Sequence, residues 1–232
     1  MTLEERLASV RLRIERAAQK SGRSGSDVTL VAVTKGVSLA DVERAYQLGQ
    51  KDFGENRVQE AREKIGLCDF DANWHMIGHL QTNKARHALQ MFSLIHSLDR
   101  ISLAKELQRQ CEREDKVVRT LVQINIAGES TKFGISPEDV SGLVERVKAY
   151  DRIYIDGIMT IAPYTDDPES VRPHFAEMAR IRDMLSQRSH ERLRMRHLSM
   201  GMSGDFEVAI EEGATMVRIG TAVFGPRSAA AV

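Results

Sequence analysis

The chain has 232 residues, its 33 Lys and Arg residues are balanced by 33 Asp and Glu residues, and 42% of its residues are apolar. These values are typical of one globular domain, and the zero net charge gives no support for binding to nucleic acid or to an anionic membrane. The distant cysteines Cys68 and Cys111, the charged N-terminal segment and the lack of a long apolar stretch give no sign of a disulfide framework, a signal peptide or a membrane span, so we expect a cytoplasmic protein.

A helix is predicted at the start of the chain, over residues 1–22. Apolar residues recur at helical spacing between Leu3 and Ile14, with Arg and Glu residues between them. Thr2 is suited to cap the start of this helix, and Gly22 is suited to end it. The segment that follows, SGRSGSD, has the composition of a loop.

Strands and helices then alternate to the end of the chain. Short apolar, β-branched runs predict strands over residues 29–35, 52–56, 74–78, 94–98, 117–126, 153–161, 193–200 and 216–220. Helical spacing predicts helices between them, including one that begins at Pro137 and one over 168–186.

Eight strand–helix units in a chain of this length predict an α/β protein with a single (β/α)8 TIM-type barrel. We expect one domain over residues 1–232, with the extra N-terminal helix in front and a frayed tail at 228–232. The alternative is an open, doubly wound sheet, which the lack of a GxGxxG motif after the first strand disfavours.

Lys35 closes the first predicted strand, and the functional residues of such barrels lie at the C-terminal ends of the strands. A lysine near the apolar interior loses hydration, and the neutral amine is the form that attacks an aldehyde. Lys35 is therefore a candidate for forming a Schiff base. The alternative is a lysine that extends its ammonium group into water.

Two turns near the end of the chain are candidates for phosphate binding. The sequence reads LSMGMSGD over 198–205 and RIGTAVFG over 218–225, so that glycine stands beside Ser or Thr where a helix begins. Such turns direct backbone N–H groups toward an anion, and barrels often bind phosphate after strands seven and eight. The alternative is that these glycines only make tight turns.

Arg218 lies two residues before the second of these turns. A guanidinium only donates hydrogen bonds, so at this position Arg218 would hold a ring nitrogen unprotonated or bind a carboxylate. The alternative is a barrel-core arginine paired with an acidic residue such as Glu55.

Three other polar residues are weaker candidates. His75 and His79 lie four residues apart without a third metal ligand at a recognisable spacing, so we expect them to form hydrogen bonds near the barrel mouth. Lys132, in the loop after the fifth strand, competes as an amine, and we expect it to be a solvated loop lysine.

Six segments, taken in order, resemble the YggS-like pyridoxal phosphate homeostasis proteins. They are AVTKGVS at 32–38, FGENRVQE at 53–60, WHMIGHLQTNK at 74–84, ESTKFG at 129–134, LSMGMSGDFEVAI at 198–210 and VRIGTAVFGPR at 217–227. Each motif alone is weak, but the combination is specific and covers essentially the whole chain. The resemblance implies a fold like the N-terminal barrel domain of alanine racemase.

The resemblance also implies a site for pyridoxal 5′-phosphate (PLP). In it, the Lys35 amine forms the PLP aldimine, Arg218 meets the pyridine nitrogen, and one of the two serines joins the phosphate cup. The residues that the resemblance assigns to this site are Lys35, Asn56, Ser199 or Ser203, Arg218, Gly220 and Thr221. Two positions depart from the expected SxDME pattern: we expect Phe206 to change packing only, and Gly204 to loosen the loop and so affect affinity.

The implied function is to hold PLP for intracellular PLP homeostasis and for amino-acid and keto-acid balance, without an established reaction. PLP-dependent apoenzymes are the implied recipients, and we expect a monomer. The alternative is an amino-acid racemase or a related enzyme of the same PLP fold type. Such racemases resemble dimers in which a later β-rich domain supplies a catalytic tyrosine, whereas this chain ends at Val232 and only Tyr164 is expected near the mouth. A barrel enzyme acting on a phosphorylated metabolite is a third possibility, and it would not require Lys35.

Overall fold

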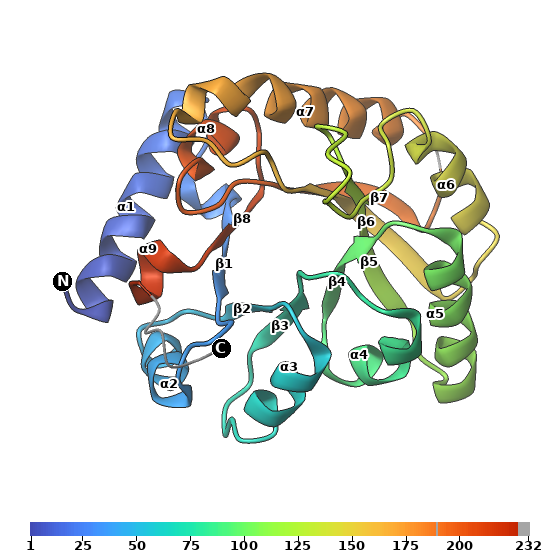
Figure 1. Cartoon of the computed structure of the whole chain (residues 1–232), viewed down its shortest axis with the longest axis horizontal. Coiled ribbons are helices and arrows are strands. Elements are labelled where there is room, and N and C mark those ends of the chain that lie inside the picture. The colour runs from blue at the N-terminus through green and yellow to red at the C-terminus, as the bar shows by residue number, and fades with distance from the viewer. Residues whose placement is uncertain (189, 227–232) are drawn as a thin grey trace.

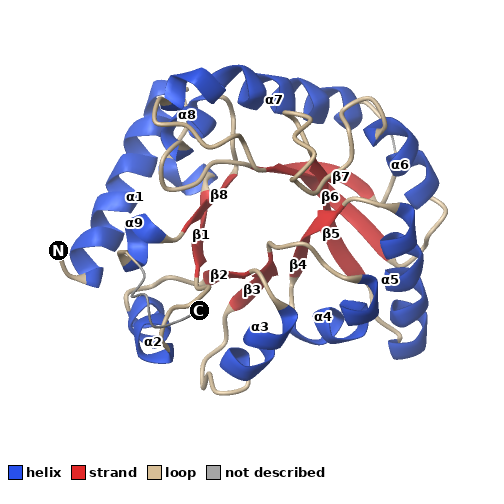
Figure 2. Cartoon of the chain, viewed as in Figure 1, coloured by secondary structure: helices blue, strands red, loops and turns tan. Residues whose placement is uncertain are grey.

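The computed structural model describes residues 1–188 and 190–226, so the predicted tail at 228–232 lies outside the described residues. Eight parallel strands pair in chain order, and the ring closes where β1 (Thr29–Val33) pairs with β8 (Met216–Ile219). Helices surround this ring of strands, as Figures 1 and 2 show. The prediction of a (β/α)8 barrel with an extra N-terminal helix is therefore confirmed.

The remaining elements lie close to their predicted positions. The other strands are β2 Asp52–Glu55, β3 Asn73–Met76, β4 Leu94–Leu98, β5 Val118–Ile124, β6 Ile153–Thr160 and β7 Leu193–Ser199. The α-helices are α1 Leu3–Lys20, α2 Leu39–Gln47, α3 Val58–Ile65, α4 Ala85–Met91, α5 Ile101–Glu114, α6 Val140–Val147, α7 Arg172–Ser186, α8 Phe206–Glu211 and α9 Thr221–Phe224. Short 3-10 turns are η1 Gly25–Asp27, η2 Thr82–Lys84 and η3 Pro168–Val171.

The predicted helix start at Pro137 is wrong, because α6 begins at Val140. The Ser136 hydroxyl donates to a carboxylate oxygen of Asp139 at 2.8 Å and accepts from the Asp139 amide at 3.3 Å. These local bonds satisfy the backbone in a turn over residues 136–139, and such side-chain bonds compete with the helical pattern. Sequence spacing alone did not reveal this competition.

Side chains along each strand alternate between the barrel interior and the helix layer. On β1, Leu30 and Ala32 belong to the large apolar core between strands and helices, whereas the buried Val31 points the other way. A second, small apolar cluster fills part of the interior and consists of Leu94, Leu121, Met159 and Met216. The alternation continues past the strand end and places Lys35 on the interior face with Val31.

Helix α1 links the N-terminal residues to α9 by side-chain hydrogen bonds. Thr2 caps the helix, as predicted, in a reciprocal pair of hydrogen bonds with Glu5. The Arg6 guanidinium donates to the carbonyl oxygens of Val223 at 2.8 Å and Phe224 at 3.2 Å, both in α9. Figure 1 shows α1 packed along α8 and α9 on the outside of β1 and β8, so α1 covers the seam at which the barrel closes.

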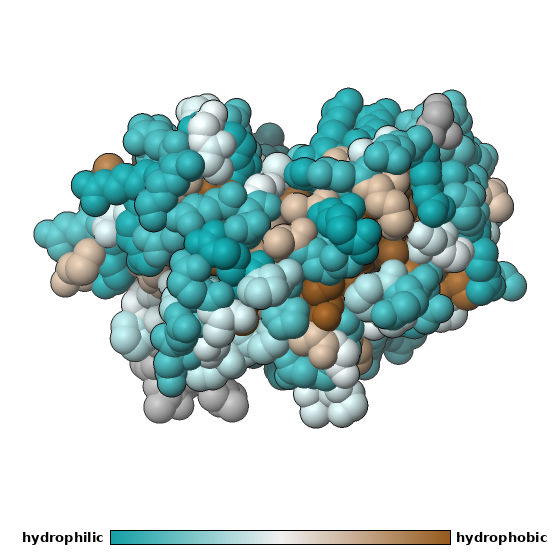
Figure 3. All heavy atoms as spheres, turned by 90° about the horizontal axis from the view of Figure 1, so that it is seen from above, coloured by the Kyte–Doolittle hydropathy of each residue, from teal (hydrophilic) through white to brown (hydrophobic). Residues whose placement is uncertain are grey.

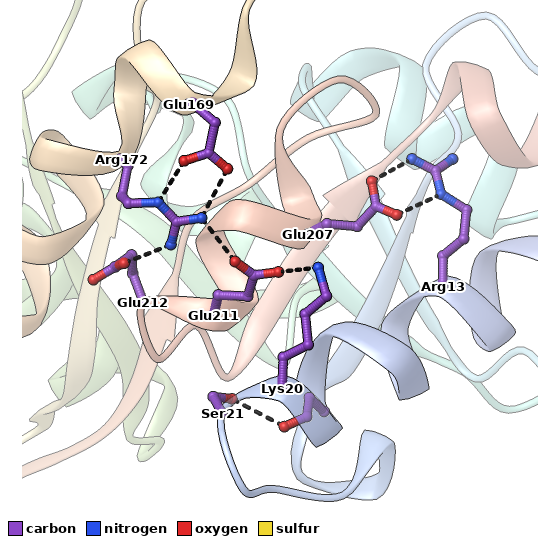
Figure 4. A network of polar contacts seen from close by, with 9 residues as sticks. Arg13, Lys20, Ser21, Glu169, Arg172, Glu207, Glu211 and Glu212 are labelled. Carbon is purple, nitrogen blue, oxygen red and sulfur yellow. Dashed lines mark hydrogen bonds and ion pairs between the residues drawn. The ribbon is translucent and has the colours of Figure 1, made fainter.

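A network of ion pairs continues this contact across the surface (Figure 4). Arg13 and Lys20 of α1 each lie 2.7 Å from a glutamate of α8, Glu207 and Glu211 respectively. Arg172 of α7 pairs with Glu211 of α8, with Glu212 directly after α8 and with Glu169 of η3. Exposed pairs contribute little singly, but a shared network holds three helices in one arrangement.

On the face seen in Figure 3, hydrophilic residues cover most of the surface, and apolar residues show mainly near its centre. Among the helices of residues 1–188 and 190–226, none is long and apolar enough to cross a membrane.

Gly157 of β6 permits an unusually close approach of β7, at a point where the register of the two strands shifts. A Cβ atom at this position would lie 1.9 Å from the carbonyl oxygen of His197. We expect Gly157→Ala to force the strands apart and to lower the free energy of unfolding by about 3 kcal/mol. Urea unfolding followed by fluorescence of Trp74, the single tryptophan, measures this change.

Gly142→Ala is the matched control, because a Cβ atom at 142, on the exposed face of α6, would contact nothing within 4 Å. Alanine favours a helix over glycine, so we expect this variant to be more stable by about 0.5–1 kcal/mol. Equal stability of the two variants would contradict the steric argument for Gly157.

Candidate functional site

Lys35 lies at the C-terminal mouth of the barrel, two residues after β1. Its side chain is half-buried, and its amine forms no hydrogen bond or ion pair with any residue of the described ranges. Two cavities meet at this lysine, which lines both of them together with Asn56. The amine is thus positioned to react with a ligand in either cavity.

The smaller cavity, of about 400 Å³, brings together the predicted phosphate turns. Ser203 and Gly204 come from the turn between β7 and α8, and Gly220 and Thr221 come from the junction of β8 with α9. The Ser203 hydroxyl accepts from the Ala222 amide at 3.3 Å and so links the two turns. Gly220 caps the start of α9, where backbone N–H groups point out of a helix.

Arg218 forms the inner wall of the same cavity and is only 4% exposed. Its Nη1 donates to the Ser199 hydroxyl at 2.7 Å, and its Nη2 donates to the Thr160 carbonyl oxygen at 2.7 Å. No carboxylate forms an ion pair with Arg218 in the described part of the chain. Burial lowers the pKa of Arg218 to about 10, and the charge of Asp205 opposes this only in part.

The alternative pairing of Arg218 with Glu55 is not observed. Glu55 ends β2 on the helix side, where its Oε1 accepts from the Lys64 amine at 2.6 Å and from the Thr34 hydroxyl at 2.5 Å. Because Arg218 points into the barrel and Glu55 points away from it, alternation along the strands keeps the two charges apart.

The structure separates the two serines that the sequence left as alternatives. Ser203 lines the smaller cavity. Ser199 is fully buried at the end of β7, where its hydroxyl contacts Arg218 and His96. Ser203 is therefore the serine that faces the smaller cavity, whereas Ser199 lies beneath Arg218.

The larger cavity, of about 720 Å³, extends from Lys35 across the ends of β2, β3 and β5. Asn56 enters its wall because Gly78 has no side chain: a Cβ atom at 78 would lie 2.3 Å from the Asn56 carbonyl oxygen. Lys132 also lines this cavity, but its amine binds Glu129 at 2.6 Å and the Ala162 carbonyl oxygen at 3.0 Å. The expectation of a freely solvated Lys132 is therefore wrong.

His75 and His79 lie in different parts of the barrel and contact different residues. His79 lies at the mouth, where its ring stacks on Phe133 with centroids 3.8 Å apart. His75 lies inside the barrel, 3.0 Å from His96 and 3.1 Å from Asp52. The described residues contain no group of three His, Cys, Asp or Glu side chains that could hold a metal ion.

Sequence reasoning missed His96. It is fully buried in the middle of β4, next to the smaller interior cluster and in contact with Ser199. A histidine within the apolar strand LIHSL was a signal that it lies inside the barrel, but its partners could not be inferred from the strand pattern.

The two departures from the family pattern have different surroundings. Phe206 is fully buried at the start of α8, and the Arg13 guanidinium lies 4.5 Å from its ring centroid, so it is a packing residue. A Cβ atom at Gly204 would meet nothing within 4 Å. The Asp205 carboxylate accepts from the Met202 amide at 2.6 Å and holds this turn closed. The effect of Gly204 on affinity stays a prediction.

The smaller cavity fits an anionic ligand that also carries a hydrogen-bond acceptor in its ring. A buried cation without a carboxylate partner favours negative charge nearby. Hydroxyl groups and a helix start supply further donors for a phosphate. Lys35 lines the same cavity.

Comparison with known proteins first assigns this chain to a fold class. The model of the alanine racemase N-terminal domain matches residues 6–228. An alanine racemase from Clostridium difficile shares only 15% identity with this chain but superposes with a TM-score of 0.72, over 99% of this chain and 58% of the other. The chain is thus an alanine racemase N-terminal domain barrel.

Proteins of higher sequence identity show to which family the chain belongs. A pyridoxal phosphate homeostasis protein from Aquifex aeolicus is 45% identical over 96% of this chain and 97% of its own length. The structure of PipY from Synechococcus elongatus with PLP bound has a TM-score of 0.82 and 35% identity, over 97% of this chain and 100% of that one. This chain therefore belongs to the pyridoxal phosphate homeostasis protein family.

Burial, together with the charges of His75, Arg218 and His197, holds the pKa of His96 well below its ordinary value of 6.5. Below pH 6.5 the unfolded chain takes up a proton at this residue and the folded chain does not, so the folded state loses stability as the pH falls. We expect His96→Gln to reduce this loss by up to about 1.4 kcal/mol per pH unit. Urea unfolding of both proteins on either side of pH 6.5 compares the slopes.

The comparison uses slopes because the substitution also changes stability at neutral pH. The histidines and carboxylates that do not contact His96 keep their surroundings in both proteins, so their contributions cancel, and only His75 changes its environment with the substitution. Identical slopes would mean that the folded protein protonates His96 as readily as the unfolded chain does.

Proposed function

We propose that this protein binds PLP at the C-terminal mouth of its barrel, with the amine of Lys35 as the point of covalent attachment. The observation that carries the proposal is the free Lys35 amine at the junction of two cavities, one of them walled by an unpaired buried arginine. PLP supplies an aldehyde carbon that bonds to a neutral amine with loss of one water molecule.

The residues around the smaller cavity would bind the other parts of PLP. Ser203, Gly220 and Thr221 supply hydroxyl and backbone donors for the phosphate group. Arg218 donates to the ring nitrogen, and Asn56 flanks the cofactor between the two cavities. In this arrangement the phosphate, ring and aldehyde each meet a different element, so binding is directional.

PLP homeostasis is the role that the family supports, since the relatives carry that name and PipY has been solved with PLP bound. We propose that the chain holds PLP and releases it to PLP-dependent apoenzymes. The larger cavity leaves room beside Lys35 for a second small molecule to reach the attachment point.

An amino-acid racemase is the second candidate, since the match to the alanine racemase barrel favours it. Racemisation needs a second acid–base group at the reacting carbon. None of the four tyrosines, all within the described ranges, lines either cavity, and Tyr164 is 90% exposed with its hydroxyl bound to Asp166. Arg218 would also leave the ring nitrogen unprotonated, which weakens the ring as an electron sink.

The attachment site is tested by mixing the protein with PLP, reducing with borohydride and mapping the modified peptide by mass spectrometry. We expect one adduct, on the peptide that contains Lys35, and we expect Lys35→Ala to lose it because Lys35 is the one lysine of the described residues that lines both cavities. Lys132→Ala is the matched control: its amine also lines the larger cavity, yet this variant should keep the Lys35 adduct.

An adduct that persists in Lys35→Ala, or one spread over surface lysines, would remove Lys35 from the proposal. The protein would then be a phosphate-binding barrel with another ligand.

The holding role predicts negligible racemisation. We expect the PLP-loaded protein to convert L-alanine into D-alanine far more slowly than roughly 1 turnover per second, since none of the tyrosines in the described ranges lines either cavity to act as a second base. Chiral chromatography of the product measures the rate. A turnover in the ordinary enzyme range would favour the racemase instead.

A further inference from the structure

A chain of buried polar groups crosses the barrel interior and ends on Arg218. The Arg218 Nη1 lies 2.7 Å from the Ser199 hydroxyl, which lies 3.1 Å from Nδ1 of His96. Nε2 of His96 lies 3.0 Å from Nδ1 of His75, and Nε2 of His75 lies 3.1 Å from a carboxylate oxygen of Asp52. The chain thus joins β8, β7, β4, β3 and β2.

Water is almost excluded from this chain. Ser199 and His96 are fully buried, His75 is 3% exposed, and only the Asp52 side chain, at 25%, has appreciable access to solvent. Buried polar groups are costly unless each donor meets an acceptor, so the direction of these hydrogen bonds can be derived.

The donor and acceptor roles of these hydrogen bonds are determined at both ends, by Arg218 and by Asp52. A guanidinium only donates hydrogen bonds, so the Ser199 oxygen accepts from Arg218. The Ser199 hydroxyl can then donate its own hydrogen bond to Nδ1 of His96. An ionised carboxylate only accepts, so Nε2 of His75 donates to Asp52. Between these ends, Nε2 of His96 must donate to Nδ1 of His75. Every bond then points from Arg218 toward Asp52, and both rings are neutral with the proton on Nε2.

The reverse direction is disfavoured. It would require His75 to carry protons on both nitrogens, and it would leave the Ser199 hydroxyl proton without an acceptor along the chain. The positive charge of Arg218 on β8 and the neighbouring His197 on β7 both oppose a cation near His96. The charge of Asp52, on β2, is the favourable partner for such a cation, and it lies beyond His75.

We propose that Ser199 and His96 are positioning residues for Arg218, which they hold in the orientation that meets the PLP ring nitrogen. The proposal rests on the proposed PLP site. The Thr160 carbonyl oxygen fixes one end of the guanidinium, and the oriented Ser199 hydroxyl fixes the other. His96 accepts the hydrogen bond that the Ser199 hydroxyl donates, and this turns the lone pairs of the Ser199 oxygen toward Arg218. The histidine therefore acts on the cofactor site without touching the ligand.

The first test needs neither a variant nor PLP. In protein labelled with ¹⁵N-histidine, the nitrogen chemical shifts distinguish the two neutral ring forms from the charged one. We expect both His75 and His96 to be neutral with the proton on Nε2. A proton on Nδ1 of His96 would overturn the proposal, and this result remains available even if a buried substitution prevents folding.

The second test measures whether Ser199 acts through Arg218. We expect Ser199→Ala to weaken PLP binding about tenfold, the usual effect of one lost bond to a charged group, and to shift the absorption maximum of bound PLP. In an Arg218→Ala background, the same substitution should change the dissociation constant by less than about twofold, since the positioned group is gone.

The outcomes separate this proposal from the proposed function. If the unchanged protein forms no borohydride adduct at Lys35, the PLP site itself is wrong. If that adduct forms but Ser199→Ala weakens PLP binding equally in both backgrounds, or leaves binding and spectrum unaltered, the positioning role is wrong and the PLP site stands.

Discussion

The alternation of side chains along eight parallel strands is the constraint on which the rest of this barrel depends. It separates Lys35 and Arg218, which point inward, from Glu55, which points outward to Lys64. One residue of register shift on β2 would bring Glu55 into the interior and give Arg218 the partner that it lacks. Gly157 and Gly78 show how tightly the strands and mouth loops must fit for this arrangement to exist.

The electrostatic character of the mouth follows from this separation. Arg218 is a buried cation satisfied by neutral oxygen atoms, and neutral histidines extend behind it. Burial of an uncompensated charge is costly, so the folded protein carries an electrostatic preference for an anion before any ligand arrives. A carboxylate paired with Arg218 would have stabilised the empty barrel and removed that preference.

The sequence predicted the barrel, most element boundaries and six of the residues that line the smaller cavity, namely Lys35, Asn56, Ser203, Arg218, Gly220 and Thr221. These features depend on local patterns: apolar runs for strands, helical spacing, and turns where Gly stands beside Ser or Thr. It did not distinguish Ser199 from Ser203, because both follow the same strand and only packing shows which one faces the cavity. It also missed His96, whose partners come from strands distant in sequence, and the turn before α6, where Ser136 competes with the helix.

The contact of α1 with α8 and α9 has a consequence for the synthesis of the protein. The ribosome makes Arg6 first, whereas its acceptors at Val223 and Phe224 emerge more than two hundred residues later. Contacts so distant in sequence form slowly, and here they cannot form before residue 224 has been synthesised. Lys35 is likewise made long before Arg218 and Gly220, so a growing chain carries the amine without the rest of its pocket. A truncated product of translation therefore has no complete site in which to sequester the cofactor.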